Sequence, residues 1–104
     1  MKEISPINFF KLYQKSSTLR IIDVRDSYDF NKYHLTYSAN IPANLLFDKH
    51  YLFLNKRYVY YLICKNGELS KEVTQFLEQF GYHVVNVMGG LDCWIGSYHI
   101  TVNF

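Results

Sequence analysis

The chain has 104 residues, of which 49% are hydrophobic and 19% charged, with a formal net charge of +2 at pH 7. This composition excludes an intrinsically disordered chain, and the length suits one domain, which we expect to span residues 1–104. The basic residues are too few and too scattered to predict nucleic-acid binding. No stretch approaches the roughly 18 apolar residues of a membrane span, so we expect no membrane partner, and we see no apolar region typical of a signal peptide. Because one of the two cysteines is a candidate reactive thiol, we expect a cytoplasmic protein.

In the first part of the chain, Ser5 followed by Pro6 marks the start of a helix, with serine as the cap and proline at the first helical position. This helix is predicted to run to about Gln14, with Ile7, Phe10 and Tyr13 facing the core. Further on we expect a buried strand over 19–24, a short helix over 27–32 packed through Tyr28 and Phe30, a brief strand at Asn40-Ile41 and a helical turn over 43–47.

The second half contains the stretch with the clearest chemistry. An apolar run over 58–63 predicts a strand buried on both faces, and the next residue is Cys64. A tight loop containing Gly67 leads to an amphipathic helix over 70–80, with Gly81 as its left-handed cap. Residues 51–54 fit either a short helix or an extended crossover. A strand over 84–88 and a last helix over 91–97 complete the prediction.

The alternation of strands and helices predicts an α/β fold with a mainly parallel central sheet flanked by helices on both faces. Such sheets carry their sites at the carboxyl ends of the strands. Asp23–Arg25, Cys64–Leu69 and Met88–Gly90 all follow predicted strands, so we expect these three segments to gather on one side.

Cys64 is predicted to lie in a loop that leads into a helix N-terminus. The unpaired N–H groups and partial positive charge of a helix N-terminus favour an anion, so a thiolate there is stabilised. Lys65 adds a nearby cation, and Gly67 permits torsions that let successive N–H groups form an anion-holding nest. The alternative is a buried structural cysteine, and the motif as a whole favours the reactive thiol. Two cysteines 29 positions apart predict neither a disulfide framework nor a metal site, and no cofactor is implied.

Three motifs together resemble one family. Ile21-Ile-Asp-Val-Arg25, continuing through His34 to Asn40-Ile-Pro42, resembles the first block of rhodanese-like domains; 61–70 is similar to their active-site loop; and Val87-Met-Gly-Gly-Leu-Asp-Cys-Trp94 is similar to their closing motif. The resemblance implies a parallel α/β domain that carries sulfane sulfur as a cysteine persulfide. The implied partners are a small sulfane-sulfur donor such as thiosulfate and an acceptor that is cyanide or a thiol, a protein thiol included.

The family's roles transfer to individual residues. Cys64 matches the catalytic, persulfide-bearing nucleophile, and Asp23 and Arg25 match a block that supports the fold near the site. For Arg25 we expect an ion pair with Asp29 or another acid, for His34 a structural role, and for Trp94 and Gly89-Gly90 packing and backbone clearance. The substrate-binding active-site loop is expected to comprise Lys65, Asn66, Gly67, Glu68, Leu69 and Ser70.

Two positions depart from the family pattern. Small members usually read Cys-x-x-Gly-x-Arg-Ser, and Leu69 stands here at the arginine. Leucine supplies neither charge nor a bidentate fork for an anionic donor, so we expect persulfide chemistry with weak thiosulfate turnover. Tyr37 replaces a usual glycine, which we expect to change the local loop path.

Two other functions compete with sulfur transfer. A non-catalytic binding or sensing module would keep the fold, with Leu69 as an apolar contact at the mouth of the site. A cysteine phosphatase or arsenate reductase would need an arginine in the loop, and Glu68 would repel a dianion, so this alternative is the weaker one. Cys93 could resolve a persulfide at Cys64, although a position without a redox role is the favoured interpretation.

Overall fold

The computed structural model of the chain describes residues 1–16 and 18–98. Its strands are β1 (Glu3–Ile4), β2 (Arg20–Asp23), β3 (Ser38–Asn40), β4 (Val59–Ile63) and β5 (His83–Val87). Its helices are α1 (Pro6–Lys15), α2 (Ser27–Lys32), α3 (Ala43–Lys49) and α4 (Glu68–Glu78), with short 3-10 turns η1 (His50–Leu52) and η2 (Gly90–Cys93). The prediction of one domain over 1–104 extends beyond the described residues at its carboxyl end.

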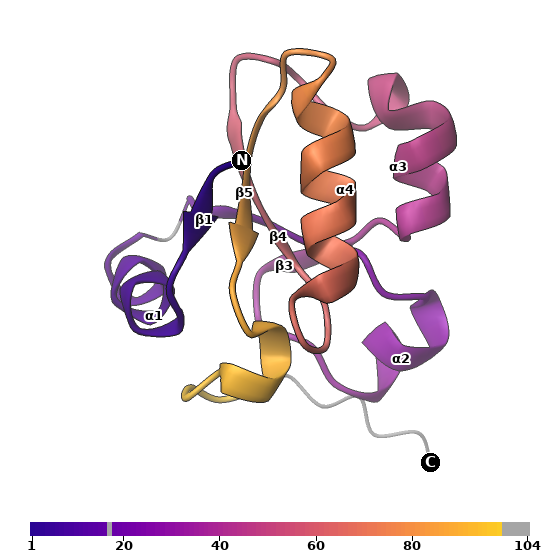
Figure 1. Ribbon diagram of the computed structural model, residues 1–104. Helices are drawn as coiled ribbons and strands as arrows, with labels where there is room; N and C mark the ends of the chain where they lie inside the picture. Colours follow the sequence, from indigo (N-terminus) through magenta and orange to yellow (C-terminus); the bar gives the residue numbers. More distant parts are fainter. Residues whose placement is uncertain (17, 99–104) are drawn as a thin grey trace.

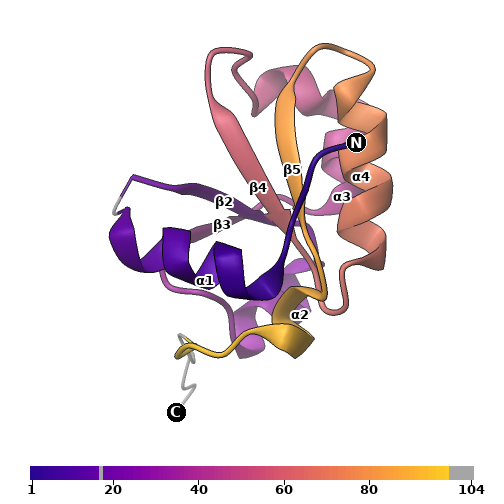
Figure 2. The same ribbon diagram turned by 60° about the vertical axis from the view of Figure 1, so that its left-hand side comes forward.

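The strands form one parallel sheet in the order β1-β5-β4-β2-β3, and Figure 2 shows β4 and β5 side by side near its middle. Leu62 of β4 is in register with Ile22 of β2 and with Asn86 of β5. The predicted α/β fold with a mainly parallel sheet is confirmed. All four strand pairings are parallel, so the carboxyl ends of the strands meet at one edge of the sheet.

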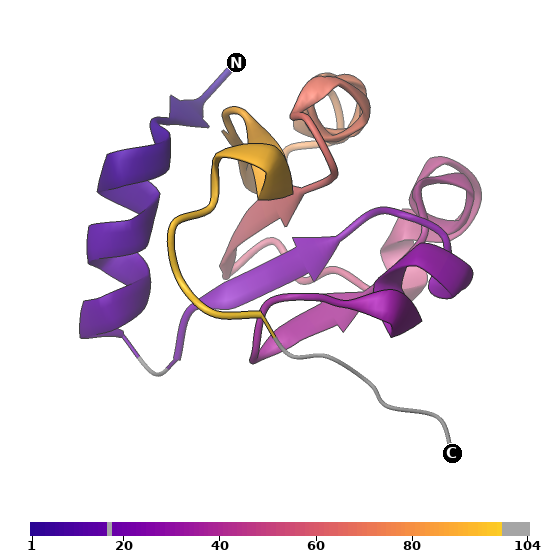
Figure 3. The same cartoon turned by 90° about the horizontal axis from the view of Figure 1, so that it is seen from below.

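Helices cover both faces of the sheet, with α1 on one side and α3 and α4 on the other (Figure 3). Side chains of β4 alternate between the two resulting cores, as the period of a strand requires. Tyr60, Leu62 and Cys64 pack in the core under α3 and α4, whereas Ile63 packs with Phe9 of α1. Cys64 therefore points toward the side of the sheet that α4 occupies.

Helix α1 begins as predicted, with the Ser5 side chain accepting a hydrogen bond from the Asn8 N–H at 3.3 Å. Its core-facing side was predicted only in part. Ile7 is 52% exposed, and the buried residue is Phe9. The reason is the aromatic packing against Trp94, whose ring centroid lies 5.8 Å from that of Phe9 and 4.8 Å from that of Tyr13. That contact fixes which side of α1 faces inward.

Three further predictions need correction or refinement. Tyr28 is exposed, with the Lys32 Nζ 4.3 Å from its ring centroid, so it does not pack in the core. The predicted helix over 91–97 is only the turn η2, which ends at Trp94 in extended backbone. The helix after Cys64 starts two residues earlier than predicted, at Glu68.

Among the described residues, the helices are too short or too polar to span a membrane.

Candidate functional site

The loop from Cys64 to Gly67, helix α2 and turn η2 come together where the strands end. Figure 1 shows the three at the lower end of the molecule, with the N-terminus of α4 above the loop. This arrangement follows from the parallel sheet, because every strand delivers its next residues to the same edge. The structure thus brings the segments after β2, β4 and β5 to one place.

Cys64 is buried, with 2% of its surface exposed, and two backbone N–H groups donate to its sulfur. The N–H groups of Gly67 and Ser70 donate to Sγ at 3.2 and 3.3 Å, and the Ser70 Oγ lies 3.2 Å from it. Gly67 caps α4 with φ of 89°, the left-handed conformation that glycine adopts without strain. Two backbone N–H groups and the positive end of α4 therefore point at one sulfur atom, an arrangement that stabilises negative charge on it.

The glycine pair after β5 holds η2 against this loop. A Cβ on Gly90 would lie 2.3 Å from the Cys64 carbonyl oxygen, so only glycine allows the two backbones to approach. In that position the N–H groups of Leu91 and Asp92 donate to the carbonyls of Cys64 and Lys65 at 2.9 and 2.8 Å. The glycine pair therefore provides backbone clearance, as the sequence predicted. The close approach holds the carbonyl groups of Cys64 and Lys65 in place.

We predict that Gly90→Ala destabilises the fold more than Gly81→Ala does. Both glycines have positive φ, but a Cβ on Gly81 meets only the Lys56 side chain, at 3.9 Å. Gly81→Ala should cost about 1 kcal/mol from backbone strain alone. Gly90→Ala adds a clash with backbone oxygens. Urea unfolding of the two variants measures the difference, and equal destabilisation would contradict this role of the pair.

Asp23 and Arg25 form a buried ion pair beside the loop. The Arg25 Nε and Nη2 donate to the Asp23 carboxylate at 3.0 and 2.9 Å, and Nη2 also donates to the Tyr33 carbonyl at 2.7 Å. Burial disfavours the charged guanidinium, but the hydrogen bonds and charge of Asp23 outweigh that effect, and the pKa of Arg25 is raised above its ordinary value. The predicted ion pair therefore forms, and its acid is Asp23.

A cleft of about 290 Å³ opens above Cys64. Each cation that lines it has an acidic partner. Lys65 lies 3.2 Å from Asp92, and Lys32 lies 3.6 Å from Asp29. Leu69 is 36% exposed and adds an apolar wall. The residues that line the cleft are Arg25, Asp29, Lys32, Tyr33, Cys64, Lys65, Asn66 and Leu69. The cleft therefore offers no unpaired positive charge among these residues to an anionic ligand.

The remaining polar residues of the loop have partners other than the sulfur. Asn66 uses its side-chain oxygen to accept the Glu68 N–H at 3.1 Å, which steadies the first turn of α4. Glu68 itself is exposed and is not among the residues that line the cleft. Lys65 extends to Asp92 at the surface. Of the predicted loop, Gly67 and Ser70 are the residues whose polar atoms contact Sγ.

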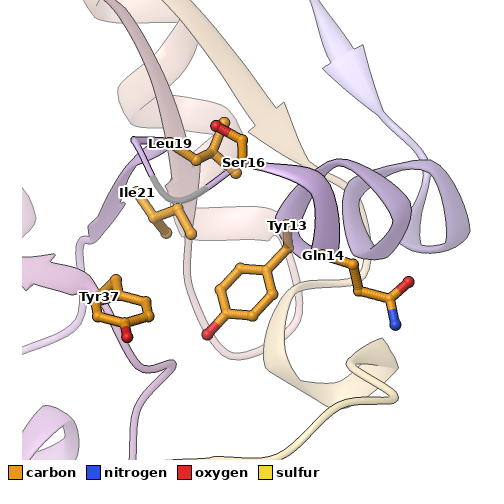
Figure 4. Close-up of a pocket in the computed structure, with 6 residues that line it drawn as sticks. All are labelled: Tyr13, Gln14, Ser16, Leu19, Ile21 and Tyr37. Carbon is orange, nitrogen blue, oxygen red and sulfur yellow. The ribbon is translucent and has the colours of Figure 1, made fainter.

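Two sequence features lie outside the cleft. His34 stacks on Phe30 at a centroid distance of 3.8 Å, and its Nδ1 lies 2.7 Å from the Phe30 carbonyl oxygen. Tyr37 has φ of 70°, the left-handed conformation that costs a residue other than glycine strain. It lines a separate cavity of about 190 Å³ together with Tyr13 of α1 (Figure 4). That cavity shares no lining residue with the cleft above Cys64.

Asn86 is a buried polar residue beside the site that the sequence did not reveal. It sits in β5 with 1% of its surface exposed, and its Oδ1 lies 2.6 Å from the Ser70 Oγ. The available signal was an amide within the otherwise apolar run Val84-Val-Asn-Val87, because buried polar side chains need partners. Among the described residues, no group of three His, Cys, Asp or Glu side chains is arranged to hold a metal ion.

Comparison with known proteins identifies the family. Residues 9–97 match the rhodanese-like domain, and the chain belongs to that family. It is 29% identical over 97 residues to "Putative sulfurtransferase YtwF" of Bacillus subtilis, covering 93% of each chain. A rhodanese-like domain protein from Staphylococcus aureus superimposes with a TM-score of 0.86 at 29% identity, over 98% of this chain and 100% of that one.

Other relatives are longer than this chain. "Putative sulfur carrier protein YrkF" of Bacillus subtilis is 30% identical over 91% of the chain, which spans 51% of that protein. "Adenylyltransferase and sulfurtransferase uba4" of Ogataea parapolymorpha is 36% identical over 81% of the chain, which spans 21% of its length. The domain thus occurs both nearly alone and as part of larger proteins, and the names of these relatives refer to sulfur transfer or sulfur carriage.

Proposed function

We propose that this protein is a sulfurtransferase or persulfide carrier that moves sulfane sulfur through Cys64. The observation that supports this most is the convergence of the Gly67 and Ser70 N–H groups on the Cys64 sulfur at the base of the cleft. Relatives named for sulfur transfer and sulfur carriage support the same function. The partners are then a small sulfane-sulfur donor and an acceptor that is cyanide, a small thiol or a protein thiol.

The reaction has two steps at one sulfur atom. The Cys64 thiolate attacks the outer sulfur of the donor, so a new S–S bond forms while the donor's S–S bond breaks and its electron pair leaves with sulfite or a shortened polysulfide. An acceptor nucleophile then attacks the outer sulfur and releases the Cys64 thiolate. The N–H groups at the α4 N-terminus stabilise the negative charge that the sulfur carries before attack and after release.

The test is sulfur transfer to cyanide with two donors, inorganic polysulfide and thiosulfate. We expect thiocyanate to form readily from polysulfide and slowly from thiosulfate, because the cations around the cleft are paired with acids and Leu69 contributes no charge. Thiocyanate from neither donor would rule out the proposed function.

We predict that Leu69→Arg raises kcat/KM for thiosulfate about tenfold to a hundredfold. Leu69 lines the cleft beside Cys64, so an arginine there can add a charged hydrogen bond to the donor, which is worth roughly 1.5–3 kcal/mol. Leu69→Met, which changes the side chain without adding charge, is the matched control. An unchanged rate in Leu69→Arg with the fold intact would show that charge at this position does not limit thiosulfate use.

A binding or sensing module is the second candidate, favoured by the paired charges and the exposed leucine at the cleft. Thiol reactivity separates the two functions. If Cys64 alkylates at neutral pH no faster than free cysteine, the N–H groups of Gly67 and Ser70 do not activate the thiol, and the binding module becomes the better proposal.

A further inference from the structure

Two buried polar side chains, Asn86 and Ser70, connect the exposed Glu3 of β1 to the Cys64 sulfur. The Asn86 Nδ2 lies 3.4 Å from both the Glu3 Oε2 and the Gly67 carbonyl oxygen, and its Oδ1 lies 2.6 Å from the Ser70 Oγ. The Ser70 Oγ in turn lies 3.2 Å from Cys64 Sγ. Ser70 and Asn86 are 0% and 1% exposed, so neither side chain can exchange these partners for bulk water.

The partners determine where the hydroxyl proton of Ser70 lies. The groups near Nδ2 of Asn86 are a carboxylate oxygen and a carbonyl oxygen, which only accept, so the NH₂ side of the amide must face them. The amide oxygen therefore faces Ser70. Because that oxygen has no proton, the Ser70 hydroxyl donates to it at 2.6 Å, a much shorter distance than the 3.3 Å from the Ser70 Oγ to the Gly67 carbonyl oxygen, the other acceptor within reach.

One hydroxyl has one proton, so this bond affects the thiol. With its proton donated to Asn86, the Ser70 Oγ presents lone pairs to Cys64, and the favourable contact at 3.2 Å is then the thiol S–H donating to that oxygen. A thiolate lacks this proton and would compete with Asn86 for the hydroxyl of Ser70. We propose that Asn86 is a positioning residue that holds the Ser70 proton away from Cys64 and so restrains ionisation of the thiol in the resting protein.

This inference deepens the proposed function, because it names the residue that sets how readily the sulfur nucleophile forms. Other charged and titratable groups surround the thiol, and all of them remain when Asn86 is replaced: Arg25 after β2; Asp29, Lys32 and Tyr33 in and after α2; Lys65 and Glu68 around the loop; Asp92 in η2; and Glu3 in β1. Their effect is common to wild type and variant and cancels in the comparison.

The test is the pH profile of Cys64 alkylation by iodoacetamide, measured in a Cys93→Ser background so that one thiol reacts. We expect Asn86→Val to lower the midpoint of the profile by about one pH unit. The freed hydroxyl then donates to the thiolate at 3.2 Å, because a charged acceptor binds it more strongly than the neutral Gly67 carbonyl at 3.3 Å. The substitution leaves the Gly67 carbonyl with its bond from the Lys71 N–H. Asn86→Asp keeps an acceptor for Ser70 and adds a negative charge, and because both effects disfavour the thiolate its midpoint should not fall. Asn86→Ala serves as a second variant if valine disturbs the fold.

A second background tests whether Ser70 is the intermediary. In Ser70→Ala the replacement of Asn86 by valine should leave the midpoint unchanged, because no hydroxyl proton remains to be redirected. An unchanged or raised midpoint in Asn86→Val and Asn86→Ala would overturn the proposal, and so would an equal shift with and without the Ser70 hydroxyl. Alkylation requires no sulfur donor, so these results stand apart from whether the protein transfers sulfur.

Discussion

Replacing Cys64 by serine should reduce the rate of sulfur transfer from polysulfide to cyanide by about a thousandfold or more. Serine is nearly the same size and fits the buried position, but its hydroxyl ionises far less readily and cannot carry the transferred sulfur as a persulfide. The N–H groups of Gly67 and Ser70 that meet the sulfur would remain in place around the oxygen. The expected loss is therefore chemical, with the stability of the fold close to that of the wild type.

The matched control is Cys93→Ser. Cys93 is the other free thiol of the chain and is exposed on η2, whereas Cys64 is buried in the loop. We expect Cys93→Ser to keep the wild-type transfer rate. Comparable losses in the two variants would indicate that Cys93 takes part in the reaction, and full activity in Cys64→Ser would remove the basis of the proposed mechanism. The rate of thiocyanate formation from polysulfide and cyanide measures the activity of both variants.

Replacing Arg25 by methionine should lower the free energy of unfolding by about 3 kcal/mol. The Asp23 side chain is 0% exposed, and its charge would remain buried without the cation that neutralises it. Methionine keeps an apolar stem of similar length, so the expected cost comes from the unpaired carboxylate and from the lost hydrogen bond to the Tyr33 carbonyl. Urea unfolding followed by circular dichroism measures the change.

A double-mutant cycle separates the ion pair from general packing. Asp23→Asn combined with Arg25→Met removes both charges, and we expect this double variant to be more stable than Arg25→Met alone. If the two single effects simply add, the pair does not contribute as a unit. Because the pKa of Arg25 is raised above its ordinary value, its guanidinium stays charged and its contribution is present throughout the neutral range.

The sequence predicted the parts of the fold that depend on local pattern. The buried strand before Cys64, the Ser5-Pro6 helix start and the left-handed Gly81 follow from residue preference and periodicity within a few positions. The prediction that Ile7 faces the core is wrong, because the side of α1 that faces inward is set by contact with Trp94, a residue far along the chain. Such a contact leaves no signal in the local pattern of the helix.

The candidate site shows the same division. The meeting of the segments after β2, β4 and β5 could be predicted, because a parallel sheet delivers its strand ends to one edge. The side-chain pairs that form within the site could not be predicted. Lys65 reaches Asp92, and Asn86 meets Ser70, through side-chain geometry between distant residues. These pairings decide how much charge the cleft offers and which atoms touch the sulfur.

The most direct test of the account is to find where a transferred sulfur atom resides. Wild-type protein is incubated with inorganic polysulfide, freed of donor, digested under non-reducing conditions and examined by peptide mass spectrometry. We expect one extra sulfur atom on the peptide that contains Cys64, none on the peptide that contains Cys93, and loss of that sulfur on addition of cyanide. No added sulfur on the Cys64 peptide, or added sulfur only at Cys93, would contradict the account.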